Sequence, residues 1–409
     1  MVALLNGIRA VGIAWYGVGP IAGFILAQFG AEVIKIENPK GGDQWRGFNR
    51  PGVRTVPPGN HNIGFEIWNR QTKSLTVDLT KEKGREIVYR LVAKSDAVFT
   101  NYLPSQLNRL SVDYDTLSKY NPQLVYAASS SFGKNGPDRD KRAFDHLAIA
   151  RSGIMLASGD TGQPPTDIKG AVADTTAGTF LAFSVIAGLL AKERLGVGQE
   201  ISTSLFAPMI WLQQANIQQY LYGGDAAERQ SRLNPVNPLN NNYKCKDGRW
   251  FKLGGAVGGA DPNAVWHDTC HLLGMETFEN DSRFKDMRAR QDNSEELVGI
   301  LDKVFLTKTR DEWIGHFKTA NMRILFEAIQ DITELANDPQ VIANNYFVED
   351  NHPTLGPIKR VPFPMEFGKT SIMSDLAPAP LLGEHTEEIL LELGYARGEI
   401  ADLKNDKAI

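Results

Sequence analysis

The chain has 409 residues, a formal net charge of −4 at pH 7, and two cysteines. The length exceeds one ordinary hydrophobic core and predicts two domains, and the slightly acidic balance argues against a nucleic-acid-binding protein, which usually carries a basic face. The cysteines are too few for a disulfide framework, the N-terminus lacks a signal-peptide layout, and no apolar run is expected to reach the roughly 20 residues of a membrane span. We therefore expect a cytoplasmic protein without a membrane segment.

Strands and helices alternate through the first 200 residues. Ile8–Ala14 and Ala31–Glu37 are predicted strands, with a helix at Ile21–Phe29 between them. Further strands are expected at Leu75–Leu79, Ala97–Thr100 and Leu124–Ser129, and an amphipathic helix at Lys81–Ser95. This alternation predicts an α/β fold with a doubly wound, Rossmann-like parallel sheet, in which ligands bind beyond the carboxyl ends of the strands.

A glycine pattern follows the first strand and invites a dinucleotide-binding interpretation. Gly17, Gly19 and Gly23 are spaced G-x-G-x-x-x-G, and Glu37 ends the second strand. The spacing differs from the G-x-G-x-x-G fingerprint. Pro20, placed at the start of the predicted helix, removes an N–H group that a pyrophosphate would use. The pattern is therefore weak support for an NAD-dependent oxidoreductase.

Asp174 precedes a long apolar helix predicted from Thr175 to about Leu195. An Asp in this place is most often an N-cap, because its oxygen accepts hydrogen bonds from the first N–H groups of the helix. It is also a carboxylate that can form covalent acyl intermediates as a nucleophile. The two interpretations are compatible, because a capping carboxylate is fixed in orientation.

Several charged side chains are candidates for binding phosphate or acting at a site, although each alone is more often a solvated charge. Lys73, Arg109 and Arg142 could pair with phosphates by charge-assisted hydrogen bonds. Asp145 could cap the helix that runs through Ala150, and His146 is expected to be a structural donor.

The amino-acid composition changes after about Tyr220, where a loop rich in Pro and Asn precedes a predicted small α+β domain. Its expected elements are a strand at Trp250–Gly255 and helices at Ala264–Leu273, Ser294–Leu306 and Thr309–Ala320. His267 and His271 lie four residues apart, a spacing that suits zinc on a helix. The segment HDTCH lacks the Glu of H-E-x-x-H and shows no third ligand, so no metal is expected.

Taken together, the motifs resemble the family III CoA-transferases of the formyl-CoA and carnitine CoA-transferase type. The resemblance runs from Gly7 to about Gly394 and rests on Gly19-Pro20, the segment AEVIKIE with Gly42-Asp43 and Arg46, Ala173-Asp174 with Gly178, Lys192–Arg194, Gly196-x-Gly198-Gln199, and Ala379–Thr386 (APLLGEHT). It implies an interlocked dimer, expected to be a homodimer. In each subunit, residues 1–200 and about 335–409 would form the large CoA-binding domain and residues 225–330 the small one.

The resemblance also implies the reaction, transfer of coenzyme A from an acyl-CoA to a free carboxylic acid without a metal. Asp174 matches the nucleophile, which would form an aspartyl anhydride and then an aspartyl-CoA thioester. Asn101, Tyr102 and Arg109 match the segment that holds CoA, Lys73 a CoA-contacting position and Arg142 a position near the adenosine. Asp145 would be a secondary site residue, and Tyr16, Gly17 and Phe48 would belong to the substrate pocket.

Two departures from the family bear on substrate and reaction. The glycine-rich loop of formyl-CoA transferase has no counterpart at Asn237–Tyr243, and Gly17 replaces a polar side chain. A larger or aromatic acid such as a substituted succinate is expected, with succinyl-CoA as a possible donor. A 2-methylacyl-CoA racemase, the nearest alternative, needs a His base where this chain has Phe144. His146 is displaced by two positions, about 200° around a helix. A subunit of a heteromeric transferase is the other alternative.

Overall fold

The computed structural model consists of two compact units. It describes residues 3–47, 55–56, 61–226, 228–256, 258–320, 323–373 and 376–409. The large unit comprises Met1–Met155, Asp167–Ala226 and Tyr346–Ile409, and the small unit comprises Leu156–Thr166 and Ala227–Asn345. The chain thus leaves the large unit and returns to it twice.

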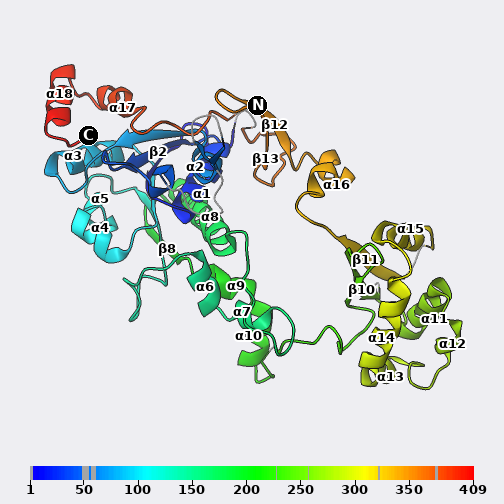
Figure 1. Ribbon diagram of the computed structural model, residues 1–409. Helices are drawn as coiled ribbons and strands as arrows, with labels where there is room; N and C mark the ends of the chain where they lie inside the picture. The colour runs from blue at the N-terminus through cyan, green and yellow to red at the C-terminus, as the bar shows by residue number, and fades with distance from the viewer. Residues whose placement is uncertain are drawn as a thin grey trace. The chain divides into compact units, whose positions relative to one another are not determined.

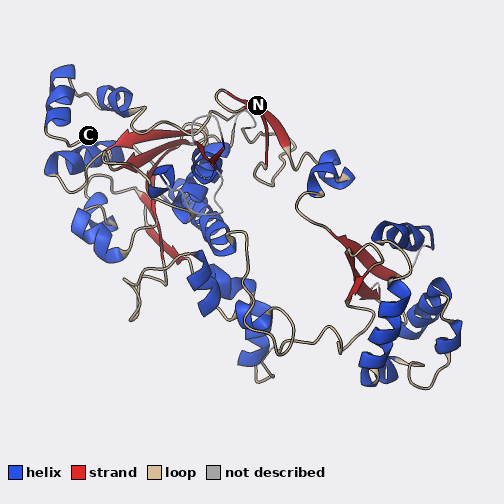
Figure 2. Cartoon of the chain, viewed as in Figure 1, coloured by secondary structure: helices blue, strands red, loops and turns tan. Residues whose placement is uncertain are grey.

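Within the described residues, a parallel sheet of six strands forms the centre of the large unit, in the order β5-β2-β1-β6-β7-β8 (Figures 1 and 2). The strands are β1 (Arg9–Ile13), β2 (Glu32–Glu37), β5 (Thr72–Thr76), β6 (Ala97–Thr100), β7 (Val125–Ser130) and β8 (Glu200–Ser204). In chain order this arrangement is 3-2-1-4-5-6, the order of dinucleotide-binding folds. The strand order reverses between β1 and β6, where such folds bind ligands beyond the carboxyl ends.

Helices α1 (Val18–Gln28) and α8 (Val172–Leu195) cover one face of this sheet. Small residues allow the close packing. A Cβ on Gly178 would lie 2.6 Å from Cγ2 of Ile21 on α1, and one on Gly188 would lie 2.8 Å from Cδ1 of Ile201 on β8. Glycine is unfavourable inside a helix by roughly 1 kcal/mol, so close contact with α1 and the sheet accounts for both positions.

The opposite face is covered by α3 (Glu82–Val92) together with α17 (Thr386–Glu392) and α18 (Arg397–Asn405). The helices near the C-terminus therefore pack on the same sheet as the N-terminal strands (Figure 1). Ile87, Leu91 and Leu390 are fully buried in this layer. Burying apolar side chains on both faces is what a parallel sheet requires.

Shorter elements complete the large unit. They are η1 (Gln44–Gly47), β3 (Thr55–Val56), β4 (His61–Asn62), α2 (Ile63–Asn69), α4 (Pro104–Leu110), α5 (Tyr114–Leu117), α6 (Asp145–Arg151), α9 (Ala207–Leu212), α10 (Gln214–Leu221), β12 (Val348–His352) and β13 (Gly356–Arg360), with α7 (Ile154–Ala157) at the boundary between the units.

Several predicted boundaries differ from the structure, and three of these differences matter for the site or the sheet. Helix α8 begins at Val172, so Asp174 lies inside its first turn and is not the N-cap; Ala171 precedes the helix in a left-handed conformation, with φ of 53°. Helix α1 begins at Val18 and contains Pro20 in its first turn, where the missing N–H has no helical partner to lose. Strand β5 is Thr72–Thr76 and not Leu75–Leu79, because its backbone pairs in register with β2.

Among the described residues, α8 is long and apolar enough to cross a membrane by length and composition, with 44% of its apolar window buried within the chain. The expectation that no apolar run approaches that length was wrong. Its contacts with α1 and β7 give its apolar residues a packing role in the large unit.

The small unit has an antiparallel sheet in the order β11-β10-β9, formed by β9 (Asn242–Lys244), β10 (Trp250–Ala256) and β11 (Ile324–Ile329). Its core joins this sheet to α11 (Pro262–Leu273), α14 (Ser294–Phe305) and α15 (Arg310–Ala320). The other elements are α12 (Glu276–Glu279), α13 (Met287–Asp292), η2 (Leu335–Asn337) and α16 (Pro339–Ala343). One sequence argument fails here, because Glu279 supplies a third possible metal ligand beside His267 and His271.

Candidate active site

A cavity of about 260 Å³ opens at the carboxyl edge of β1 and β6, at the point where the strand order reverses. Residues from the turn after β1, the loop after β6, the end of β7 and the starts of α6 and α8 line it: Trp15, Tyr16, Gly17, Val18, Gln44, Asn101, Leu103, Gln106, Ser129, Ser130, Ser131, Arg142, Ala143, Phe144, Asp174 and Leu205. The cavity therefore lies where a doubly wound sheet binds ligands.

The turn after β1 is held in an unusual conformation. Tyr16 has a φ of 66°, a region that costs a residue with a side chain roughly 1–2 kcal/mol. Its N–H donates to both carboxylate oxygens of Asp43, at 3.2 and 3.1 Å. The side-chain amide of Asn101 makes two hydrogen bonds with the backbone of Trp15. It accepts from the Trp15 N–H at 3.1 Å and donates to the Trp15 carbonyl at 2.7 Å. The Asn101 side chain thus fixes the turn that leads into the cavity.

Asp43 belongs to a buried network in which carboxylates are matched by cations. Nζ of Lys35 lies 2.6 Å from Oδ2 of Asp43, and Nη2 of Arg46 lies 2.6 Å from Oε2 of Glu37. Although burial alone would raise it, the hydrogen bond from Arg46 and the charges of Lys35 and Arg46 hold the pKa of Glu37 below its usual value. Glu37 also accepts from Oγ of Ser74. Because Glu37 is occupied in this network, it does not serve as a ribose-binding acid.

Asp174 lies in the first turn of α8, against the turn that follows β1. A Cβ on Gly17 would lie 2.5 Å from Cγ of Asp174 and closer still to Oδ2. The absence of a side chain at Gly17 therefore allows the Asp174 carboxyl group to occupy this place. Because the Asp174 carboxyl group fills the space that glycine leaves, the missing side chain at Gly17 does not give additional room for a substrate.

A second carboxylate lies beside Asp174. The Asp174 N–H donates to Oδ1 of Asp145 at 3.0 Å, and Asp145 is the first residue of α6. Burial, and then the negative charge of Asp145, raise the pKa of Asp174 to about 7. Groups whose pKa is moved close to neutrality cluster at functional sites. The pair thus differs from the network of Asp43 and Glu37, where each carboxylate faces a cation.

Aromatic rings border the cavity. The Tyr16 ring lies 5.3 Å from that of Phe144 and 5.6 Å from that of Trp45, centroid to centroid. Trp45 in turn stacks on Trp68 at 4.7 Å. Such pairs are rigid apolar surfaces and make this side of the cavity suitable for an apolar or aromatic group.

A family model described as CoA-transferase family III matches residues 5–386. The chain belongs to CoA-transferase family III. It is 30% identical over 407 residues to the (R)-2-hydroxy-4-methylpentanoate CoA-transferase of Clostridioides difficile, covering 99% of each chain. It is 31% identical over 400 residues to the succinyl-CoA:glutarate CoA-transferase of Mus musculus, covering 98% of this chain and 88% of that one. The crystal structure of a CAIB/BAIF family protein from Brucella suis superposes with a TM-score of 0.85 at 27% identity, covering 96% of this chain and all of that one.

In this family III CoA-transferase, the structure gathers part of the predicted site in one cavity. Tyr16, Gly17, Asn101, Arg142 and Asp174 line it, and Asp145 contacts Asp174. The prediction for Phe48 falls outside the described residues.

Two predicted CoA ligands lie elsewhere. Nζ of Lys73 is 2.9 Å from Oε1 of Glu32 and 2.7 Å from Oε1 of Glu388, so its charge is matched by two carboxylates. Arg109 is exposed on α4 and does not line the cavity.

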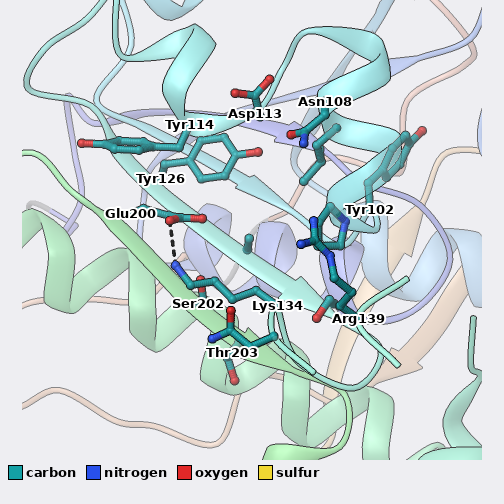
Figure 3. Close-up of a pocket in the computed structure, with 15 residues that line it drawn as sticks. Tyr102, Asn108, Asp113, Tyr114, Tyr126, Lys134, Arg139, Glu200, Ser202 and Thr203 are labelled. Atoms are coloured by element: carbon teal, nitrogen blue, oxygen red, sulfur yellow. Dashed lines mark hydrogen bonds and ion pairs between the residues drawn. The ribbon is translucent and has the colours of Figure 1, made fainter. Parts of the chain in front are cut away.

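Tyr102, in the loop after β6, lines a neighbouring cavity, also of about 260 Å³, that runs along β7 and β8 (Figure 3). Lys134 and Arg139 lie on one side of it and Tyr114 and Tyr126 on another; Nζ of Lys134 is 2.9 Å from Oε2 of Glu200. Both cavities include Tyr102 or its neighbours and Ser130. The CoA-transferase thus has two adjoining hollows along one sheet edge.

Sequence reasoning missed Gln44 and Ser129 as lining residues. Oγ of Ser129 is buried and has no hydrogen-bond partner among the described residues. A buried hydroxyl without a partner is uncommon, and a bound substrate would supply one. The sequence signal was present in the polar run that ends β7, Ser129-Ser130-Ser131.

The racemase alternative is not favoured, since the relatives are named CoA-transferases. Phe144 lines the cavity and His146 does not. One supporting argument was wrong: Phe144 precedes α6 in an extended conformation, and its ring lies 6.5 Å from that of His146 at an interplanar angle of 16°, not on the opposite side of a helix.

Proposed function

We propose that the protein moves coenzyme A from an acyl-CoA donor to a free carboxylic acid, with Asp174 as the covalent nucleophile. The observation that carries this is the half-buried Asp174 carboxyl group, which faces the cavity beside Gly17 and has its pKa raised to about 7. A carboxylate with a pKa near neutrality is available at physiological pH and is a better nucleophile than one with an ordinary pKa.

The reaction balances without any further reagent. An Asp174 oxygen attacks the thioester carbonyl, the C–S bond breaks, and a mixed anhydride and the CoA thiolate form. The thiolate then attacks Cγ of Asp174, releasing the donor acid and leaving an aspartyl-CoA thioester. The acceptor carboxylate attacks Cγ to regenerate an anhydride and the thiolate, which finally attacks the acceptor acyl carbon. Each covalent step conserves activation in the acyl group.

The surroundings of Asp174 suit the charge that develops in these steps. Val18, the first residue of α1, lines the cavity, and among the described residues no side chain caps this helix. Helix N-termini stabilise negative charge, and fixed donors at a developing oxyanion are worth several kcal/mol. Ser129 would add a hydroxyl donor.

Trapping the acylated enzyme tests the nucleophile. Hydroxylamine added with an acyl-CoA donor should inactivate the protein and modify the peptide that holds Asp174, because hydroxylamine attacks the anhydride or thioester carbonyl. Donor alone and hydroxylamine alone are the controls. Modification on the peptide that holds Asp145 instead would assign the nucleophile there.

We infer that the acceptor is a larger or aromatic acid. The rings of Tyr16 and Phe144 border the cavity, and a relative from Clostridium sporogenes, 30% identical over 410 residues, is named cinnamoyl-CoA:phenyllactate CoA-transferase. Substituted succinates remain candidates, since another relative is named for succinyl-CoA and D-citramalate, and succinyl-CoA is the proposed donor. A panel of acids should show higher kcat/KM for branched or aryl acids than for formate or oxalate.

For the CoA moiety, Arg142 is the strongest of the proposed cations, because it is exposed and lines the cavity. Arg142→Gln should raise KM for the acyl-CoA with a smaller effect on kcat. Lys73 and Arg109 remain proposals as phosphate contacts, with Asn101 and Tyr102 shaping the pocket. A KM unchanged in Arg142→Gln and raised in Lys73→Gln would reverse this order.

A homodimer is proposed from exposed apolar side chains in the large unit. Phe183 and Leu190 of α8 are 64% and 51% exposed, and Trp211 of α9 is 58% exposed. Exposed apolar groups gathered on neighbouring helices are typical of interfaces, and α8 and α9 pack against each other. Light scattering of the purified chain should give twice the 45.2 kDa monomer mass. A monomer that gains activity only with a related chain would favour the heteromeric alternative.

A further inference from the structure

The small unit carries a cluster of metal-ligating side chains on α11 and α12. The rings of His267 and His271 lie one helical turn apart, 4.4 Å between centroids. Glu279 lies beside both: Oε2 is 3.1 Å from Nε2 of His271, and Oε1 is 3.7 Å from Nε2 of His267. We propose that these three side chains bind a divalent cation of the zinc class. This inference is independent of the proposed transfer chemistry.

The backbone around the cluster is well fixed. Asp261 caps α11 by accepting from the Asn263 N–H at 3.0 Å, and Gly274 ends the helix with a φ of 67°. Trp266, buried on the opposite side of α11, donates from Nε1 to the backbone carbonyl of Glu279 at 3.3 Å. This bond ties the end of α12 to α11. The two histidines and the carboxylate therefore project from anchored elements, as a metal site requires.

Each imidazole has a carboxylate at its other nitrogen. Nδ1 of His267 is 3.4 Å from Oδ1 of Asp268, and Nδ1 of His271 is 4.0 Å from Oε1 of Glu276. A carboxylate that accepts the Nδ1 proton directs the lone pair of Nε2 toward a metal. Asp268 lies within hydrogen-bond distance of His267 for this role, whereas Glu276 is near His271 but beyond that distance. Here both Nε2 atoms face Glu279, so the orientation is the one that shared ligation needs.

The ligand atoms are close enough to converge on one ion. They all lie within 4.8 Å of one another, whereas ligands about 2.0–2.1 Å from a tetrahedral zinc are roughly 3.3 Å apart. Small side-chain rotations would close this difference, since both histidines are about half exposed, at 53% and 50%. Two imidazoles and a carboxylate favour zinc, nickel or copper over magnesium or calcium. The exposed side leaves a fourth position for water.

The local charge favours a dication. Glu279, Asp268 and Glu276 contribute three negative charges around two imidazoles, and Arg323, with Nε 3.6 Å from Oδ2 of Asp268, offsets one. Cys270 does not compete as a ligand, because it is buried on the core side of α11. Without a metal, a protonated His271 would form a simple ion pair with Glu279, and this is the alternative to be tested.

Calorimetric titration with Zn²⁺ distinguishes a metal site from a simple ion pair between His271 and Glu279. The full-length protein is stripped with EDTA, desalted, and titrated at pH 7.5 in a buffer that does not bind metal. We expect one saturable Zn²⁺ site that His271→Ala and Glu279→Gln abolish, and that Asp268→Asn weakens on the order of 10-fold. His316→Ala is the matched control, an exposed histidine on α15 of the same unit that should leave the titration unchanged. Substitution with Co²⁺ should give tetrahedral visible absorption that His271→Ala removes.

Two results would overturn the proposal. One is Zn²⁺ binding of the same stoichiometry and affinity in wild type and His271→Ala, which would mean adventitious surface binding only. The other is the absence of saturable binding in a wild-type protein whose thermal melting shows it to be folded. A melting temperature raised by Zn²⁺ but not by Mg²⁺, and only when His271 and Glu279 are present, would support the site independently of calorimetry.

Discussion

Two groups of carboxylates lie at the same edge of the same parallel sheet, and their surroundings are opposite. Asp43 and Glu37 are each within 2.6 Å of a cationic nitrogen, from Lys35 and Arg46. Asp174 instead has another carboxylate, Asp145, as its neighbour and a pKa raised to about 7. A carboxylate paired with a cation is stabilised in its charged form and serves the fold. One left without a cation is held in a reactive state, at some expense of stability.

The largest expected effect follows from removing the unpaired carboxylate. Asp174→Asn should lower kcat/KM by at least about 10³-fold, because the amide cannot form the anhydride, and loss of a catalytic nucleophile costs this much or more. The folded protein should survive, since Asp174 does not cap α8. Turnover with a defined acyl-CoA and acid measures the loss. Near-wild-type turnover in this variant would remove Asp174 from the mechanism.

The pH dependence of the melting temperature of Asp174→Asn tests the raised pKa of Asp174. The folded-state pKa of Asp174, about 7, lies above the ordinary value of 3.8. Ionisation therefore disfavours the folded state, and this group's contribution to stability is lost as pH rises from about 4 to 7. Asp174→Asn should melt at a higher temperature than wild type at pH 8 and lose that advantage at pH 5. A higher melting temperature for the wild type at pH 8 would contradict the raised pKa.

For Asp43, which is paired with Lys35, we expect that removing the partner lowers the stability of the fold and is not primarily an effect on the transfer chemistry. Lys35→Met leaves the buried Asp43 carboxylate without its cation, which should lower the free energy of unfolding by about 3–5 kcal/mol. Urea denaturation measures it. Lys192→Met is the matched control, because its pair with Asp96 is 3.1 Å long and partly exposed on both sides. That substitution should cost about 1 kcal/mol or less. Equal decreases in the free energy of unfolding of the two variants would show that burial does not make the Lys35–Asp43 pair more important for stability.

The sequence predicts local features of this molecule well and contacts between distant residues poorly. Strand β6 has the predicted bounds, Ala97–Thr100, because a short apolar run flanked by polar residues has one good register. Asp174 was selected by its local motif. Its contact with Gly17 was not, since the two residues are far apart in the chain and only the packing of α8 on α1 brings them together.

The predictions from sequence failed where a residue's role depends on side chains that are distant in the chain. Lys73 was selected as a free cation, but Glu388, from the C-terminal end of the chain, lies 2.7 Å from its Nζ. The third ligand beside His267 and His271 was missed because Glu279 belongs to a separate short helix. In both cases the residue type was visible, whereas its neighbour depended on tertiary structure, which local patterns do not report.

A smaller effect is expected from restoring a side chain beside the unpaired carboxylate. In Gly17→Ala the new Cβ would lie 2.5 Å from Cγ of Asp174, so the carboxyl group must move. A displacement of about 1 Å in a reacting group can cost on the order of 10²-fold in rate. The kcat of this variant is compared with that of Gly398→Ala, where a Cβ meets no atom within 4 Å. Similar kcat values in both variants would show that the Asp174 carboxyl group works from another position.

The smallest expected effect is a shift in the pH dependence of kcat/KM. Wild-type kcat/KM should rise with pH and level off above about 7, because only the ionised Asp174 attacks. Asp145→Asn removes the neighbouring charge, while its Oδ1 can still accept from the Asp174 N–H at 3.0 Å. The rising limb should therefore move to lower pH. It should not reach the ordinary Asp value, since burial, the larger cause of the raised pKa, remains. A limb that stays in place would mean that burial alone sets this pKa, and one that moves to higher pH would mean that the Asp145 carboxylate favours the ionised form of Asp174.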